Sequence, residues 1–345
     1  MKHYIKLVLI SLSLMFFLTA CEDEPSSSSD EVRLVLAAYT TPREAYGEII
    51  PRFQDYWLAE TGQKGIFEES YLGSGAQSRA VVEGFEADIV ALSLEADVTR
   101  IQNAGLITHD WKAGEFQGIV TTSIVAFAVR QGNPKNVQDW PDLTKPGIEV
   151  LTPNPNMSGG AMWNILGLYG AALRGQIAGV PGDDHAAAAD FLSQVLTNVS
   201  VMDKSARESI LNYEMGIGDL AITYENEVLV GRNSGQDYEL VIPTSTILIE
   251  NPIAVVDMYV EKHGTRKVAE AFVQFLFSRE AQDIFAKYGL RVVNPEAAAA
   301  SASLYPEVDD LFTIEYFGGW DVVMEDYFGQ EGIYNAVIMQ VQGGE

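Results

Sequence analysis

Cysteine is almost absent from this chain, because Cys21 is the only one among 345 residues. A lone cysteine excludes an internal disulfide and a thiolate metal cluster. Histidine is also scarce, and His109, His185 and His263 are too scattered for a metal-binding pattern such as H-E-x-x-H. We therefore predict that these histidines are surface or capping residues, and we expect neither a metal centre nor a cofactor.

Basic residues are few, since 22 lysines and arginines stand against 48 aspartates and glutamates and give a formal net charge of −26. This balance excludes nucleic acid as a partner. It also repels small anions at long range. Any anion site must therefore depend on short-range hydrogen-bond donors in a dehydrated cleft.

Long apolar runs are missing except near the start, where Lys2 and Lys6 precede an apolar stretch over residues 7–18. The run is too short to span a bilayer, and it predicts a secretory signal peptide over residues 1–20. The L-T-A-C at 18–21 resembles a bacterial lipoprotein box, which implies cleavage before Cys21 and lipidation of its thiol. An ordinary secreted protein is the alternative. The polar residues that follow predict a flexible tether over 21–30.

From residue 32 onward, short β-rich runs alternate with helical patterns, which predicts an α/β fold with βαβ units and parallel sheet. The pairs are 33–38 with 45–60, 88–92 with 97–104, and 148–152 with 161–173, followed by strands at 199–202, 220–224 and 238–242. About 315 mature residues exceed what one core usually encloses, so we expect two lobes.

Two longer β-branched runs, 119–129 and 246–258, are not followed promptly by a helix. We predict that they cross between the lobes. Lobe one is then 31–118 plus 249–345, and lobe two is 119–248, with the ligand cleft at the hinge. Open α/β sheets bind ligands beyond the carboxyl ends of their strands.

Four loops place small or hydroxyl residues where an apolar run gives way to a helical pattern: T-T-P-R-E (40–44), G-S-G-A-Q (73–77), M-S-G-G-A-M-W (157–163) and K-S-A-R-E-S (204–209). The first-turn N–H groups and the positive dipole end of a helix attract anions. One such loop is usually only a cap. Four in one chain predict an oxyanion site.

These motifs, in this order, resemble those of the periplasmic sulfate-binding proteins of bacterial ABC importers. In the first half of the chain, A-Y-T-T-P-R (38–43) resembles the family's S-Y-D-P-T-R, and G-S-G-A-Q (73–77) resembles its G-S-G-K-Q. The longest motif, N-P-N-M-S-G-G-A-M-W-N (154–164), resembles N-P-K-x-S-G-G-A-R-W-N. Further on, S-A-R (205–207) resembles G-A-R, Y-E-N-E (224–227) resembles W-E-N-E, and F-G-G-W at 317–320 resembles a C-terminal F-G-G-W. The resemblance covers residues 32–330. It implies a two-lobed type II periplasmic-binding-protein fold with two crossover strands.

The resemblance also implies how the anion is held. Backbone N–H groups would come from Thr40, Ser74, Gly159, Gly160 and Ala206, with a hydroxyl from Ser158 and a side-chain donor at Tyr224. Without a Cβ, the two glycines let the main chain approach an oxyanion closely.

The chain departs from the family pattern at Tyr224 for Trp, Thr40 for Asp and Ala76 for Lys. An indole only donates, whereas a tyrosine hydroxyl donates or accepts. A site with an acceptor tolerates HPO₄²⁻, and Glu208 is a second candidate acceptor, although we favour a role for it at the helix dipole.

Other charged residues near these motifs could have either a structural or a functional role. Glu225 and Glu227 would share a face of a strand as a carboxylate pair, but we favour structural roles. We expect Arg43 and Arg207 to brace the loops and not to touch the anion.

The resemblance implies a monomeric solute-binding lipoprotein, not an enzyme, that delivers sulfate, with thiosulfate as a second ligand, to ABC permease transmembrane subunits. It would lie in the periplasm or on the outer face of the cytoplasmic membrane, held there by its lipid anchor. Binding of phosphate, molybdate or tungstate by the same fold, or a sensor lipoprotein, remains the alternative. An extracytoplasmic hydrolase is disfavoured because no histidine-containing constellation is present.

Overall fold

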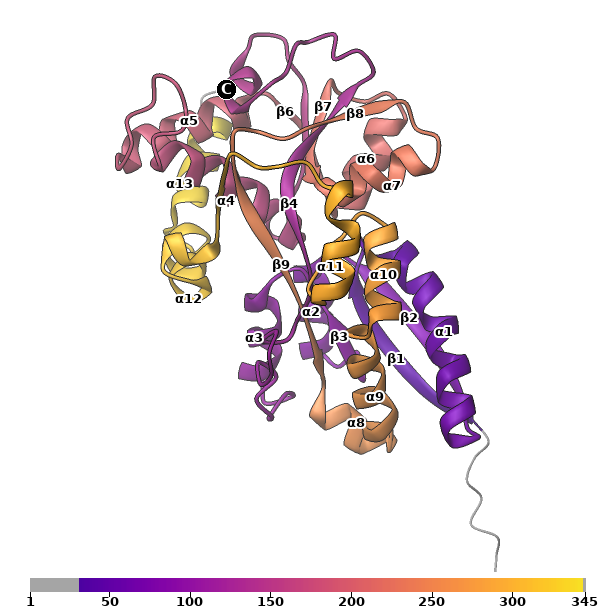
Figure 1. The fold of residues 1–345 in the computed structure, drawn as a ribbon. Helices are drawn as coiled ribbons and strands as arrows, with labels where there is room; N and C mark the ends of the chain where they lie inside the picture. Colours follow the sequence, from indigo (N-terminus) through magenta and orange to yellow (C-terminus); the bar gives the residue numbers. More distant parts are fainter. Residues whose placement is uncertain (1–30, 344–345) are drawn as a thin grey trace, which may run out of the picture.

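Two long antiparallel strands, β4 (Ile119–Arg130) and β9 (Ser245–Val255), form the connection between the two halves of the molecule (Figure 1). The computed structural model describes residues 31–343, so Cys21 and the predicted signal peptide and tether lie outside the described residues. β9 pairs with β3 of the first half, and β4 pairs with β7 and β8 of the second. The predicted crossover strands are therefore confirmed, but the second ends at Val255, because Asp257 already begins a helix.

The first lobe is a parallel sheet with helices on both faces. β1 lies between β2 and β3. Phe53 and Phe272 belong to the apolar cluster on one face of this sheet, and Val98 belongs to the apolar cluster on the opposite face. Its elements are β1 (Glu31–Tyr39), α1 (Arg43–Thr61), β2 (Lys64–Leu72), α2 (Ser74–Val82), β3 (Ile89–Ala91), α3 (Glu95–Asn103), α8 (Asp257–His263), α9 (Arg266–Leu276) and α10 (Arg279–Lys287).

The second lobe continues the sheet from β4 in the order β7-β5-β6. β5 is parallel to both neighbours, whereas β7 and β8 are antiparallel to β4, so the predicted parallel sheet is correct within each lobe and wrong at the crossover strands. Its elements are a 3₁₀ helix η1 (Trp140–Thr144), β5 (Val150–Pro153), α4 (Gly159–Leu173), α5 (His185–Thr197), β6 (Val199–Asp203), α6 (Ala206–Glu214), β7 (Leu220–Tyr224), α7 (Glu225–Asn233) and β8 (Tyr238–Val241).

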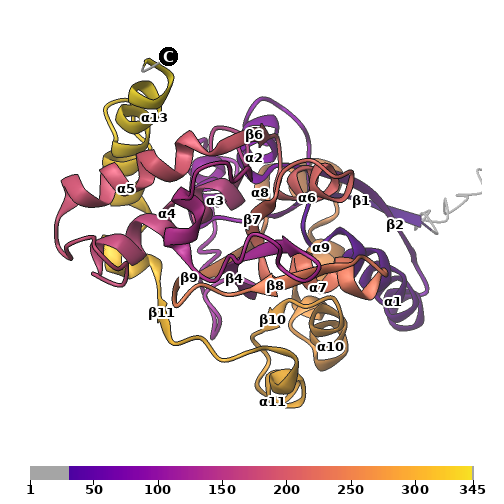
Figure 2. The ribbon, with the colours of Figure 1, turned by 90° about the horizontal axis from the view of Figure 1, so that it is seen from above.

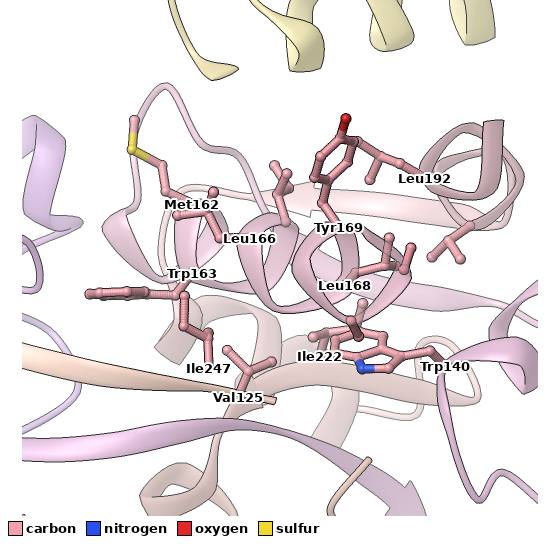
Figure 3. Packing of buried hydrophobic residues seen from close by; sticks show 14 of the residues in the cluster. Val125, Trp140, Met162, Trp163, Leu166, Leu168, Tyr169, Leu192, Ile222 and Ile247 are labelled. Atoms are coloured by element: carbon pink, nitrogen blue, oxygen red, sulfur yellow. The ribbon is translucent and has the colours of Figure 1, made fainter. Parts of the chain in front are cut away.

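Helix α4 is the centre of the second lobe, because every one of its residues is buried. Figure 3 shows Val125, Ile222 and Ile247 on the sheet side of α4, and Leu192 near Tyr169 on another side. A helix that is apolar all round must be covered on all sides. This packing fixes the position of its first turn, at Gly159.

The C-terminal segment returns to the second lobe. Phe312, Trp320 and Tyr327 belong to the same apolar cluster as α4 and α5, and the ring of Trp320 lies edge-on to Trp163 at 4.8 Å. Figures 1 and 2 both place α13 beside α5. The segment comprises β10 (Arg291–Val292), α11 (Pro295–Ser301), η2 (Ala302–Leu304), β11 (Asp310–Phe312), η3 (Ile314–Phe317), α12 (Trp320–Val322), the π-helix η4 (Val323–Tyr327) and α13 (Ile333–Gly343).

The lobe boundaries at 118 and 249 stay a prediction. The packing of the last helices leads us to propose that residues 310–343 be assigned to lobe two instead of lobe one, because their apolar side chains are buried there. Within residues 31–343, no helix combines the length and the apolar character needed to cross a membrane.

Candidate functional site

The starts of three helices in lobe two meet around Gly160. A Cβ atom added at Gly160 would lie 2.8 Å from Cε2 of Tyr224, 3.4 Å from Cβ of Ala206 and 3.4 Å from Oγ of Ser158. Ser158 precedes α4, Ala206 begins α6, and Tyr224 directly precedes α7. The close approach explains why glycine stands at position 160.

The start of α2 in lobe one lies against the same loops. A Cβ atom on Gly73 would lie 2.5 Å from the carbonyl oxygens of both Met157 and Lys204, and the N–H of Ala76 donates to the Met157 carbonyl at 3.1 Å. Ser74, the first residue of α2, is buried. The two lobes are therefore in contact at this point.

Thr40 approaches from the carboxyl end of β1. The ring of its neighbour Tyr39 lies 6.2 Å from that of Tyr224, and Nη2 of Arg207 donates to the Thr41 carbonyl at 3.3 Å. The structure thus brings the residues proposed from the sequence into one place, while their role as ligands stays a prediction: Thr40, Ser74, Ser158, Gly159, Gly160, Ala206 and Tyr224.

The site is rich in free donors. As first-turn residues, Ser74, Gly159, Gly160 and Ala206 have no acceptor within their own helices. Their N–H groups also have no backbone acceptor elsewhere in residues 31–343. The Ser158 side chain makes no capping bond. These donors and the positive dipole ends favour an anion.

A chain of buried hydroxyls joins the lobes behind these donors. The hydroxyls of Ser93 and Tyr224 lie 2.6 Å apart, the Ser93 N–H donates to Oγ of Ser74 at 2.9 Å, and the Ser74 hydroxyl donates to Oδ2 of Asp97 at 2.5 Å. Nε1 of Trp163 donates to the Ser93 carbonyl at 3.0 Å. Burial raises the pKa of Tyr224, so its hydroxyl stays protonated at neutral pH and can donate.

Ser93 is the residue that the sequence reasoning missed. It follows β3, which ends at Ala91, and so it lies at the carboxyl end of a parallel strand like the four loops that were identified. The same rule would have found it, but no glycine or helix-start motif marks the position.

The buried carboxylates nearby are paired with arginines. Nε of Arg207 donates to Glu227 at 2.7 Å, and Nη2 of the same side chain donates to Glu44 at 2.9 Å. Burial raises the pKa of Glu227, although the Arg207 charge opposes this shift. Arg207 therefore joins the two lobes, and its donors are occupied by two carboxylates and the Thr41 carbonyl.

Glu225 is held separately, by Nε of Arg291 at 2.8 Å. The suggestion that Glu225 and Glu227 share a face of a strand is wrong, because both lie in the first turn of α7 and engage different arginines. Each carboxylate has a structural partner. This arrangement gives neither the geometry nor the freedom of an acid/base pair.

Glu208 acts as a helix cap. Its carboxylate accepts the N–H of Lys204 at 3.0 Å, and its own N–H donates to Oγ of Ser205 at 3.2 Å. This reciprocal pair resembles a capping box. The role at the helix start that we favoured for Glu208 agrees with this geometry, and one of its two carboxylate oxygens is engaged as an acceptor.

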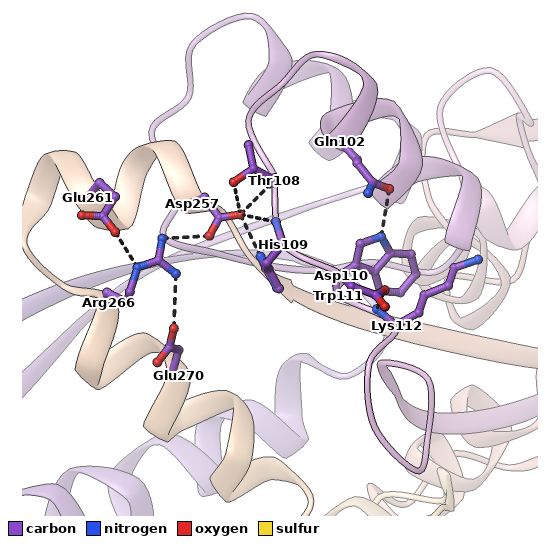
Figure 4. Close-up of polar contacts among 10 residues, drawn as sticks. All are labelled: Gln102, Thr108, His109, Asp110, Trp111, Lys112, Asp257, Glu261, Arg266 and Glu270. Carbon is purple, nitrogen blue, oxygen red and sulfur yellow. Dashed lines mark hydrogen bonds and ion pairs between the residues drawn. The ribbon is translucent and has the colours of Figure 1, made fainter.

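The histidines have structural partners away from the site. Nδ1 of His109 lies 2.7 Å from Asp257, which also receives Arg266 (Figure 4), and Nδ1 of His263 lies 2.9 Å from Asp88. Nδ1 of His185 lies 3.0 Å from the Tyr169 hydroxyl. In the part of the chain that the structure describes, no group of three or more His, Cys, Asp or Glu side chains is arranged to hold a metal.

Comparison with known proteins identifies the family of this chain. The family model for bacterial extracellular solute-binding proteins matches residues 34–291. The sulfate-binding protein of Synechocystis sp. is 43% identical over 343 residues, which cover 96% of this chain and 96% of that protein. The thiosulfate-binding protein of Pseudomonas aeruginosa is 35% identical over 309 residues, 88% of this chain and 91% of that protein. The solved structure of the sulfate-binding protein SubI from Mycobacterium tuberculosis superposes with a TM-score of 0.77 at 38% identity, and the match covers 85% of this chain and 98% of SubI.

Proposed function

Because this chain belongs to the sulfate-binding proteins of the bacterial extracellular solute-binding family, we propose that it captures sulfate outside the cytoplasm and delivers it to an ABC permease. The observation that supports this most directly is the meeting of the α4, α6 and α7 starts around Gly160, with the α2 start against the same loops. The first N–H groups of α2, α4 and α6 are free of backbone acceptors among the described residues. Sulfate carries no proton at neutral pH, so a site made of donors suits it.

The strength of such a site comes from direct hydrogen bonds. Micromolar binding corresponds to about −8 kcal/mol. A helix dipole supplies about 0.3–1 kcal/mol at each start, which is too little even for several starts. A hydrogen bond to a charged group contributes about 1.5–3 kcal/mol, so about six of them offset the desolvation of a dianion and leave useful affinity.

The acceptors near the site argue against phosphate. HPO₄²⁻ must place its proton on an acceptor when it is buried. The Glu208 carboxylate receives Lys204, and the two oxygens of Asp97 receive Ser74 and Arg100. Among residues 31–343, Oε1 of Glu227 is also buried without a hydrogen-bond partner, but that carboxylate is paired with Arg207. The Ser93–Tyr224 hydroxyl pair is the acceptor that lies against the first turn of α4. Sulfate, and thiosulfate as a second tetrahedral dianion, are therefore the preferred ligands.

The same contacts suggest how binding is transmitted. An anion held by Ser74 of lobe one and Gly160 of lobe two stabilises the closed arrangement, which Arg207 and Glu44 also join. The ligand shifts the hinge equilibrium by its preference for the closed form. In this proposal the permease recognises that form, and the chain itself catalyses no reaction.

Membrane attachment through Cys21 is a separate part of the proposal. It is supported by the L-T-A-C sequence at 18–21 and by the polar stretch after it. Cys21→Ser should move the protein from the membrane fraction to the soluble extracytoplasmic fraction. An unchanged distribution would remove the anchor from the proposal and leave the binding function untouched. We propose that the chain acts as a monomer.

Isothermal titration of the mature chain from Glu22 tests the ligand. We expect tight sulfate binding that is the same at pH 6 and pH 8, weaker thiosulfate binding, and displacement of molybdate by sulfate. Phosphate binding that persists in excess sulfate and follows the protonation of phosphate would contradict the assignment. It would show that an acceptor at the site, such as the Ser93–Tyr224 pair or Glu208, receives a hydrogen bond from the phosphate proton.

A further inference from the structure

Arg79 bridges the two lobes beside the candidate anion site. It stands near the end of α2, and its Nη2 atom donates to the carbonyl of Asn156 at 2.8 Å and lies 3.7 Å from Sδ of Met157. Both partners belong to the loop that leads into α4. The bond therefore forms only when α2 and the start of α4 are together.

The charge of Arg79 has no carboxylate partner. Arg207 pairs with Glu227, Arg100 with Asp97 and Arg291 with Glu225. Arg43 also lacks an ion pair among the described residues, but it is exposed and lies over the ring of Tyr71. Among residues 31–343, no carboxylate oxygen lies within ion-pair distance of the Arg79 guanidinium, which contacts a carbonyl and a thioether. A net positive charge is left at this point.

This charge lies next to two of the helix starts. Arg79 lines a pocket of about 140 Å³ together with Gly75 of α2 and Gly159 of α4. A Cβ atom on Gly75 would lie 3.4 Å from Nη1 of Arg79, so the guanidinium lies over the first turn of α2. The remaining walls include the apolar side chains of Met162 and Phe328 and the ion pair of Asp97 with Arg100. The guanidinium is partly exposed, so its field on the anion is screened by salt.

The net charge of the chain gives a local positive charge a role in anion capture. Its net charge of −26 repels a dianion at long range. The backbone donors act only at hydrogen-bond distance. An unpaired guanidinium beside the helix starts attracts the anion at separations beyond hydrogen-bond reach but within the range that salt leaves unscreened. Once the anion is bound, the hydrogen bond from Arg79 to Asn156 holds the two lobes together.

We propose that Arg79 is an affinity-determining residue of the sulfate site, through its uncompensated charge and its interlobe bond to Asn156. The inference rests on the proposed function and assigns to Arg79 a role in the capture and retention of dianions. Arg79 is a positioning residue, since it acts beside the backbone donors and not in place of them. Ala76, one turn earlier in α2, stands where the resembling motif has lysine, so the chain carries its cation at a different position on this helix.

The test compares Arg79→Gln and Arg79→Lys with a control, Arg232→Gln, which removes one exposed positive charge from the last turn of α7. Association and dissociation rates of sulfate are measured by stopped-flow tryptophan fluorescence on the chain from Glu22, at 20 and 300 mM sodium chloride. For Arg79→Gln we expect the sulfate affinity to fall about tenfold at low salt, through slower association and faster dissociation. At high salt the affinity should fall by less, because salt already screens the charge that the variant lacks. Arg79→Lys should restore the association rate, and Arg232→Gln should change either rate less than about twofold.

Two results overturn the inference. One is an Arg79→Gln variant that binds like the parent at both salt concentrations. The other is a loss of affinity that is equal at both salt concentrations and is not recovered in Arg79→Lys, which shows a purely structural brace. Failure of the unaltered chain to bind sulfate would instead contradict the proposed function.

Discussion

The hydroxyl of Tyr224, at the end of β7, lies 2.6 Å from the hydroxyl of Ser93, which follows β3 in the other lobe. Each group has one proton, and one of them is used in the bond between the two. The pair therefore offers a single remaining proton to a ligand, as one indole N–H would. Both groups are almost completely buried, so this donor acts where hydrogen bonds to an anion are strong.

Tyr224→Phe should weaken sulfate binding by about ten- to a hundredfold, which corresponds to the loss of one hydrogen bond to a charged group, about 1.5–3 kcal/mol. Titration calorimetry provides the measurement. Tyr213→Phe is the matched control, because the Tyr213 hydroxyl is buried without a hydrogen-bond partner among the described residues. Affinity within twofold of the parent for Tyr224→Phe would show that this hydroxyl does not bind the anion.

Gly160→Ala should abolish measurable sulfate binding. The added methyl group would lie 2.8 Å from the Tyr224 ring and within 3.4 Å of Ser158 and Ala206, so the helix starts would have to separate. Gly47→Ala is the control, since Gly47 lies in α1 with open space around its Cβ position. That change should leave binding intact and raise stability by up to about 1 kcal/mol. Normal sulfate affinity in Gly160→Ala would refute the assigned location of the site.

Arg207→Met should lower the free energy of unfolding by about 3–5 kcal/mol at pH 8, because it leaves the buried Glu227 carboxylate unpaired. Sulfate binding should weaken without a change in ligand preference, since Arg207 braces both lobes. Adding Glu227→Gln should recover most of the stability. Urea unfolding of both variants measures this, and a double variant as unstable as Arg207→Met would contradict the pairing argument.

The stability loss in Arg207→Met should also depend on pH. Burial already raises the pKa of Glu227, and removal of the Arg207 charge raises it further. A carboxyl whose pKa is higher in the folded state than in the unfolded state favours folding at low pH, and that contribution is lost as pH rises through the folded-state value. The variant should therefore come closer to its parent at pH 5 than at pH 8. The opposite trend in urea unfolding would show that another group is responsible.

Asp257→Asn should destabilise the first lobe by about 2 kcal/mol at pH 7 and leave sulfate affinity unchanged. Burial raises the pKa of Asp257, but hydrogen bonds from His109, Thr108 and Arg266 outweigh burial and hold that pKa well below its usual range. The carboxylate therefore stabilises the fold above pH 4, and this stability is lost as pH falls. Urea unfolding from pH 7 to pH 2.5 should show parent and variant converging in acid. A constant difference over this range would contradict the role of Asp257.

Much of the fold follows from sequence patterns that act locally. The bounds of β1 and α4 were predicted within a few residues. The pattern of apolar residues along each segment reflects how much of its surface is buried, which for α4 is every side. The end of β9 was placed too late, since Met258 continues the apolar pattern although Asp257 already starts α8. The return of Trp320 to lobe two had no local signal, because it depends on packing against the distant Trp163.

The sequence by itself predicted the kind of site, because glycine and serine at helix starts offer backbone donors to an oxyanion. Tertiary structure alone decided which groups act together. The Ser93–Tyr224 pair joins residues 131 positions apart, and Arg79 reaches Asn156 across 77 positions. Such contacts depend on how the two lobes meet, and no short-range pattern in the chain encodes that approach.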